Sequence, residues 1–190
     1  MKDTFYVYHV VTDRNMSLGQ KIIFDDNNKS GVASRVSQKI KIVEDIYKNP
    51  QKYTIDNLDH HTKVAIRELA LEEVRKDRFA NLPSRLACLY VSETLEEAEK
   101  WCGCFVDWGR PTYRIVKLKI EGNKFKADAC NCFTPTLNKQ ENLKLAERYW
   151  LNLPNCENTP PIYEILVGGY IEVVEIVKEI NKNINAPNKD

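Results

Sequence analysis

A long apolar stretch at residues 160–177, PPIYEILVGGYIEVVEIV, constrains the fold more than any other segment. It is rich in β-branched and aromatic residues, which are typical of strands, and a glycine pair at 168–169 divides it. Paired glycines suit turns that need positive φ, so the stretch predicts a hairpin of two strands. Side chains alternate between the faces of a strand, so Ile162, Glu164 and Leu166 share one face. Glu164 would then lie on the face that its apolar neighbours mark as buried.

Hydrophobic periodicity predicts further strands and helices along the chain. A short helix is expected after Ser92 or Thr94, either of which can act as its N-cap. Strands and helices mix without regular βαβ alternation, which favours an α+β fold. The remaining strands are expected at residues 4–11, 86–91, 113–120 and 124–129, and the remaining helices at 33–47, 62–78 and 139–150.

The bulk composition is that of an ordinary globular protein. The chain has 190 residues, enough for one buried core, and we expect a single domain over residues 1–180 followed by a polar tail at 181–190. Its formal net charge of +1 indicates neither a nucleic-acid partner nor a membrane surface. No run approaches the length of a membrane span, and the N-terminal residues lack the apolar core of a signal peptide. We therefore expect a cytoplasmic protein with reduced cysteines and no membrane partner.

Common signatures for nucleotides and metals are missing or have the wrong spacing. There is no GxGxxG after a strand and no GxxxxGK, so neither common nucleotide fingerprint is present. Two CxC pairs occur at Cys102–Cys104 and Cys130–Cys132, whereas structural zinc sites usually place about two to four residues between ligands. His60 and His61 are adjacent, so their imidazoles point in different directions. We therefore expect no metal site.

Three strands each carry one polar side chain on a face predicted to be buried. Glu164 is the first. His9 interrupts the apolar face of the strand at 4–11, and Tyr90 lies near the end of the strand at 86–91. An unpartnered buried polar group costs about 1–3 kcal/mol, so each should have a protein partner or bind a ligand. We expect the three side chains to converge on one concave site.

Each of the three also has a purely structural interpretation. Tyr90 is compatible with an ordinary amphipathic core position, and a buried histidine such as His9 is often satisfied by local hydrogen bonds. Glu164 is harder to place in a core, because a buried glutamate needs a cation. Arg85 or Arg114 could supply one, in a structural ion pair.

Three segments together resemble the His–Tyr–Glu pattern of the ADP-ribosyltransferase superfamily, in its poly-ADP-ribose polymerase and diphtheria-toxin-like form. They are YHVV at 8–11, CLYVSETLEEAEKWC at 88–102 and YEILVGG at 163–169. The order PSRL, LYVS, EEAEKW, RYW, EILVGG also resembles an uncharacterised bacterial domain family that we associate with this superfamily. The resemblance implies an α+β fold with a split mixed β-sheet, flanking helices and NAD bound in the cleft of the sheet.

The resemblance also implies a role for each residue. His9 would hydrogen-bond NAD, with Thr12 among the NAD-binding residues, and Tyr90 would stack on the nicotinamide ring. Glu164 would be catalytic: it would accept a hydrogen bond from a ribose hydroxyl and stabilise positive charge as nicotinamide leaves. Loss of nicotinamide gives an oxocarbenium-like centre, which a fixed carboxylate stabilises.

Two arginines are candidates for binding the phosphates of NAD, and two features of the sequence depart from the ADP-ribosyltransferase pattern. Arg78 and Arg85 could bind the NAD pyrophosphate through bidentate hydrogen bonds, or form solvated or structural ion pairs. Ile162 stands where arginine-modifying relatives carry an acidic or amide residue, so arginine modification is not implied. The loop at 151–161 occupies the place where relatives recognise their targets, yet it shows no readable motif.

The implied function is transfer of ADP-ribose from NAD to an unidentified macromolecular acceptor, either protein or nucleic acid. Two alternatives stay open. A non-catalytic binding module would keep the same fold, and an NAD glycohydrolase would use the same residues with water as the acceptor.

Overall fold

The computed structural model of the chain describes residues 3–12, 15–25 and 27–180. Within these residues the fold is α+β, as predicted, with five α-helices and an open antiparallel sheet of five strands, where the sequence had predicted a mixed sheet. The polar tail predicted at 181–190 lies outside the described residues.

The sheet has the strand order β1-β4-β5-β2. The fifth strand, β3, also pairs with β5 but is not part of this linear order. β1 and β4 are antiparallel, with Phe5 opposite Ile120 and His9 opposite Val116. β5 has β4 and β2 as neighbours, so its central part has a pairing partner on each side. The strands are β1 (Asp3–Thr12), β2 (Lys21–Phe24), β3 (Leu89–Val91), β4 (Thr112–Asp128) and β5 (Tyr163–Glu179).

The chain forms two compact units. Within the described residues, the first unit falls in Met1–Ile22, Val91–Gly122 and Tyr170–Asp190, and the second in Ile23–Tyr90 and Asn123–Gly169. β4 and β5 run through both units.

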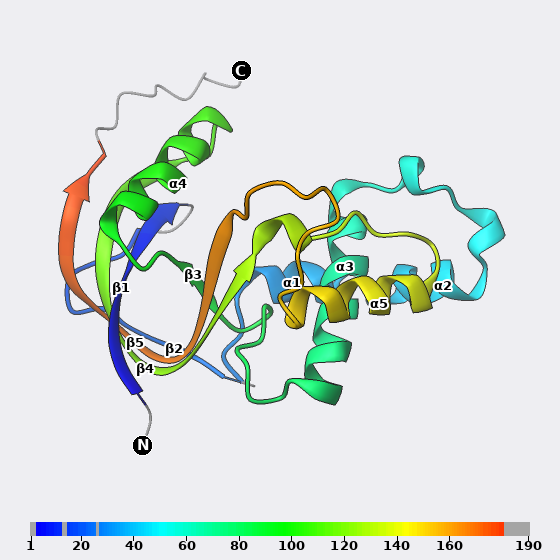
Figure 1. Cartoon of the computed structure of the whole chain (residues 1–190), viewed down its shortest axis with the longest axis horizontal. Coiled ribbons are helices and arrows are strands. Elements are labelled where there is room, and N and C mark those ends of the chain that lie inside the picture. The colour runs from blue at the N-terminus through cyan, green and yellow to red at the C-terminus, as the bar shows by residue number, and fades with distance from the viewer. Residues whose placement is uncertain (1–2, 13–14, 26, 181–190) are drawn as a thin grey trace. The chain divides into compact units, whose positions relative to one another are not determined.

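The first unit packs one helix, α4 (Leu95–Asp107), against β1 (Figure 1). Its core contains Val10, Ala98 and Ile115. The predicted N-cap at Thr94 is confirmed: its side chain accepts a hydrogen bond from the backbone N–H of Glu97, and the Glu97 side chain accepts one from the backbone N–H of Thr94. This reciprocal capping fixes where the helix begins.

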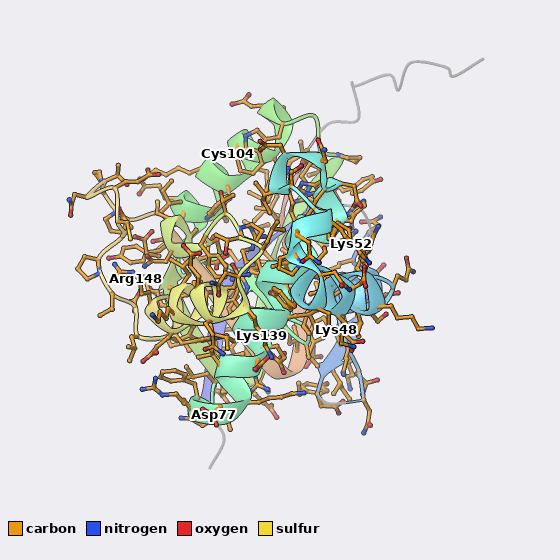
Figure 2. All side chains as sticks on the ribbon, turned by 90° about the vertical axis from the view of Figure 1, so that its right-hand side faces the viewer. Lys48, Lys52, Asp77, Cys104, Lys139 and Arg148 are labelled. Carbon is orange, nitrogen blue, oxygen red and sulfur yellow. The ribbon has the colours of Figure 1, made fainter. Side chains whose placement is uncertain are left out.

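The second unit holds the other four helices, and α1, α2 and α5 pack against α3 (Figure 1). α5 packs along α3, and Lys139 at the start of α5, labelled in Figure 2, forms a 2.9 Å ion pair with Glu73 of α3. Asp59 caps α3 by accepting from the backbone N–H of Thr62. The helices are α1 (Gly31–Ser37), α2 (Ile40–Lys48), α3 (His60–Arg78) and α5 (Lys139–Trp150), and three short 3-10 helices lie at Pro50–Lys52, Ile55–Asn57 and Ala129–Asn131.

The hairpin predicted at 160–177 is wrong, because β5 continues through the glycine pair as one strand. Pairing with neighbours on both edges supplies a continuous ladder of hydrogen bonds, which outweighs the local preference of Gly-Gly for a turn. Gly169 has φ +98°, a backbone conformation that favours glycine. A Cβ on Gly168 would lie 3.1 Å from Oδ1 of Asn123, so this position also favours glycine.

Three other predicted boundaries also differ. β3 begins only at Leu89, because the chain turns just before it, with a 2.9 Å hydrogen bond from the Ala87 N–H to the Ser84 carbonyl. The segments 113–120 and 124–129 merge into the single strand β4. The helix predicted at 33–47 is divided between α1 and α2, where Ser37 Oγ donates to the carbonyl of Ser34, a local bond of the kind that competes with helix continuation.

Candidate functional site

A buried ionic cluster lies in the second unit, centred on Arg85. We call it the Arg85 cluster; it consists of Arg85, Glu68 of α3, Tyr149 of α5 and Glu164 of β5. Nε and Nη2 of Arg85 donate to the two carboxylate oxygens of Glu68, at 2.9 and 3.3 Å. Nη1 donates to the hydroxyl of Tyr149 at 2.7 Å and to Oε1 of Glu164. The cluster therefore joins a loop, two helices and a strand.

The segment that carries Arg85 is held against α3 by two further charged residues. Arg75 donates from Nη1 to the carbonyls of Ala80 and Leu82, at 3.2 and 3.1 Å. Glu72 accepts from the hydroxyl of Ser84 at 2.7 Å. These bonds fix the chain that leads into Arg85, so the guanidinium of Arg85 enters the interior in a defined direction.

The carboxylate of Glu164 is bound through one oxygen only. Oε1 accepts from Arg85, from the hydroxyl of Tyr149 at 2.7 Å and from the thiol of Cys132 at 3.6 Å. Among the described residues, Oε2 accepts no hydrogen bond, and the side chain keeps 13% of its surface exposed. The carboxylate is thus anchored to protein donors through one of its two oxygens.

Two tyrosine rings face the guanidinium of Arg85. Its Cζ lies 4.9 Å from the ring centre of Tyr149 and 5.4 Å from that of Tyr90. Both distances are within the range of cation–π attraction. Tyr90 and Glu164, two of the residues predicted to share a site, are therefore both neighbours of Arg85.

The charges in the cluster follow from burial and pairing. Burial alone would lower the pKa of Arg85, but Tyr90, Glu164 and Glu68 raise it well above its usual value. Burial alone would raise the pKa of Glu68, but the positive charge of Arg85 lowers it below its usual value. Both residues are therefore ionised at neutral pH.

The neighbouring groups that can titrate are neutral. Burial raises the pKa of Tyr90 and of Tyr149 well above its usual value, so both keep their hydroxyl protons. Burial likewise raises the pKa of the Cys132 thiol to about 12. The thiol of Cys132 can therefore only act as a weak donor to Glu164.

The other predicted site residues lie elsewhere. His9 and Thr12 belong to β1 in the first unit, where Oγ1 of Thr12 accepts from Nη2 of Arg110 at 3.1 Å. Arg78 is exposed at the end of α3 and pairs with Glu147 of α5. Tyr90 and Glu164 thus both lie beside Arg85 in the second unit, and the convergence of all three residues on one concave site stays a prediction.

The structure selects among the alternatives for Arg85 and Arg114. All three nitrogens of the Arg85 guanidinium bind protein groups, and the residue is only 5% exposed, so a phosphate group has no access to it. Arg85 is the cation that the sequence required for Glu164. Arg114 pairs instead with Glu179, at 3.3 Å.

Sequence reasoning missed Glu68 and Tyr149. Glu68 carried the same signal as Glu164: it falls three positions from Ala65 and from Leu71, both fully buried, so it interrupts an apolar helix face. From the sequence, Tyr149 and its neighbour Trp150 could either cover a ligand cleft or simply pack. Packing is the more common fate, so the hydrogen bond from Tyr149 to Glu164 was missed.

The cysteines form no disulfide and belong to no metal-binding cluster among the described residues. The six cysteines are free thiols. In the described ranges there is no group of three or more His, Cys, Asp or Glu side chains placed to hold a metal ion. No helix in the same ranges has the length and apolar character needed to cross a membrane.

Comparison with known proteins gives one match. Residues 7–179 match the model of a family described as "Protein of unknown function (DUF2441)". A search of the curated proteins finds no match.

Proposed function

We propose that this chain, which belongs to the DUF2441 family, is a cytoplasmic NAD-dependent ADP-ribosyltransferase with Glu164 as its catalytic residue. The acceptor is a macromolecule whose identity is open. The proposal also includes a finer description of the fold. The sheet would be a split sheet of the type found in the ADP-ribosyltransferase superfamily, and NAD would be the bound substrate.

One observation carries the proposal, namely the one-sided anchoring of Glu164. A carboxylate that only balanced Arg85 could use both oxygens for protein donors. Here all three donors bind Oε1, and Oε2 has no hydrogen-bond partner among the described residues. An open oxygen on a rigidly held carboxylate can accept a hydrogen bond from a ribose hydroxyl. It also presents negative charge to the cation that forms as nicotinamide leaves.

The remaining residues take supporting roles in this proposal. The ring of Tyr90, which belongs to the same unit as Glu164, stacks on nicotinamide. Arg78 is exposed at the end of α3, so it is the arginine available to the pyrophosphate.

The loop before β5 is the candidate region for the acceptor. It belongs to the same unit as Glu164 and lines a cavity of about 380 Å³. Asp128 and Tyr163 contribute to its wall, together with asparagines and prolines of the loop. Polar and aromatic groups of this kind are typical of recognition sites.

A non-catalytic binding module is the second candidate, and the Arg85–Glu164 ion pair favours it. The pair satisfies most of the charge on Glu164 without any ligand. In that case the cluster would stabilise the second unit, and NAD would not be consumed.

Incubation with NAD labelled in its adenylate part separates the candidates. An ADP-ribosyltransferase releases nicotinamide and places label on macromolecules of an added lysate. An NAD glycohydrolase releases nicotinamide and free ADP-ribose at equal rates with and without lysate. Glu44→Gln, at an exposed position of α2, is a matched control that keeps activity, whereas Glu164→Gln abolishes it. Intact NAD after incubation with folded parent protein would support the binding module.

A further inference from the structure

Glu68 holds Arg85 from the side opposite to the open oxygen of Glu164. The two residues form a bidentate ion pair, with Nε–Oε2 at 2.9 Å and Nη2–Oε1 at 3.3 Å. Their side chains are among the least accessible charged groups described, with 3% exposed surface for Glu68 and 6% for Arg85. A pair of this geometry keeps the guanidinium in one plane and one position. Nη1 of Arg85 then reaches Glu164 from a fixed direction.

The charge balance of the cluster depends on Glu68. Arg85 bound to Glu164 alone would cancel the charge of the carboxylate, and a neutral pair stabilises a nearby cation weakly. With Glu68 present, two carboxylates share the guanidinium of Arg85, so Arg85 alone does not neutralise both of them. Because Glu68 is fully committed to its cations, Oε2 of Glu164 is the carboxylate oxygen of the cluster that has no protein donor among the described residues.

The other tyrosine and cysteine groups near Glu164 carry no charge, and Arg67 is a second cation for Glu68. Tyr149, Tyr90, Cys132 and Cys88 are the remaining titratable groups near it, and burial raises the pKa of each, so all four are neutral. Arg67 lies at the outer edge, where its Nε is 3.3 Å from Oε1 of Glu68. Its side chain is 24% exposed, so water screens its charge more than that of Arg85.

We propose that Glu68 is a positioning residue for Glu164: it orients Arg85 and offsets its charge, so that Glu164 is held rigidly yet keeps its negative charge for a ligand. The catalytic consequence rests on the proposed function. The electrostatic consequence does not, because it concerns only groups of this chain.

Carbon-13 NMR of glutamate-labelled protein tests the electrostatic consequence without any substrate. The Glu164 carboxyl signal is the one that disappears in Glu164→Gln, and its position is followed against pH. In Glu68→Gln the repulsion between the two carboxylates is lost, so the Glu164 carboxylate binds its proton less readily than in the parent. The amide oxygen of the introduced glutamine can still accept from Nε of Arg85. Glu68→Asp, which keeps the charge, restores the midpoint toward that of the parent.

Two further variants guard against a purely structural explanation. Glu73→Gln removes an exposed carboxylate of the same helix, which pairs with Lys139, and it leaves the midpoint unchanged. Arg67→Gln, at a partly exposed position that folding tolerates, moves the midpoint upward because Glu68 then acts more strongly on its neighbours. If neither Glu68→Gln nor Arg67→Gln moves the midpoint, the inference is overturned.

Turnover measured on the same variants keeps the two proposals apart. Glu68→Gln is expected to lower kcat for nicotinamide release by about tenfold or more, with KM for NAD little changed. A parent protein that releases no nicotinamide would contradict the proposed function, while the titration would still decide the role of Glu68. A tenfold loss of kcat in Glu68→Gln, with the Glu164 midpoint unchanged, would overturn the inference about Glu68. It would leave the proposed function standing.

Discussion

Arg85 donates a hydrogen bond to the carboxylate of Glu164, although 79 positions separate the two residues in the chain. The bond connects the turn before β3 to the start of β5, and Tyr149 of α5 donates to the same carboxylate oxygen. Charged groups this deeply buried are retained in folded proteins only when they are paired. The pair therefore affects both the stability of the second unit and the state of its open carboxylate oxygen.

Arg85→Met should strongly destabilise the protein. The change leaves the carboxylates of Glu68 and Glu164 in the interior without their common cation, which typically costs about 3–5 kcal/mol. Urea unfolding at pH 7 measures the loss. Arg78→Met is the matched control, because it removes an exposed pair with Glu147 and should cost about 1 kcal/mol or less. Equal losses in the free energy of unfolding for the two variants would show that the Arg85 cluster contributes no more to stability than an exposed ion pair.

Gly169→Ala should destabilise the protein by about 1 kcal/mol or more, because φ is +98° at this position and alanine avoids that region. Gly103→Ala is the comparison. It lies inside α4 with open space where a Cβ would stand, so alanine should stabilise by about 0.5–1 kcal/mol. Thermal melting of both variants measures the difference. A Gly169→Ala protein that melts with the parent would speak against the described backbone of β5.

Cys132 should react slowly with alkylating reagents in the folded protein. Burial raises the pKa of its thiol to about 12, so almost no thiolate is present at pH 8. Cys104 and Cys156 are exposed and should be modified first. Mass spectrometry of timed digests gives the order, and full modification of Cys132 should require denaturant. Early modification of Cys132 would contradict the burial of its thiol.

Asp128 should make stability depend on acid pH. Burial alone would raise the pKa of Asp128, but hydrogen bonds from the side chain of Asn155 and from the backbone N–H groups of Cys130 and Ile162 lower it below its ordinary value of 3.8. The folded pKa is therefore below the unfolded one. The stabilisation is full above the unfolded pKa and is lost as pH falls below about 4 toward the folded value.

Melting curves at pH 7, 5 and 3 test this dependence. Asp128→Asn should be less stable than the parent at pH 7 and should lose less stability than the parent between pH 5 and 3. Glu157→Gln, in the neighbouring loop, should follow the parent at every pH. Parallel curves for Asp128→Asn and the parent would contradict the account of Asp128.

Elements with local signals could be predicted from the sequence. α3 and α5 lie almost where periodicity placed them, and Thr94 caps α4 as expected. The glycine pair in β5 misled the prediction, because its conformation depends on neighbouring strands that are distant in the sequence. Long-range pairing of this kind leaves no mark on a short window.

In the candidate site too, features with a local sequence signal could be predicted, whereas those that depend on long-range packing could not. Burial of Glu164 and its need for a cation followed from the alternation of one strand, and Arg85 was one of the two cations considered. The roles of Glu68 and Tyr149 depend on how α3 and α5 pack together, which a single sequence does not encode locally. The identity of the group that meets Oε2 of Glu164 depends on a ligand, and only experiment supplies it.

Nicotinamide release by the parent and by Glu164→Gln is the most direct test of the central claim. Glutamine keeps the size of the side chain and can accept from Arg85 and Tyr149, but it lacks the charge that stabilises the developing cation. The account predicts that the folded parent releases nicotinamide from NAD and that Glu164→Gln is slower by about 10²–10³-fold, with NAD affinity and melting temperature little changed. A variant that turns over NAD as fast as the parent, or a folded parent that does not bind NAD, would contradict it.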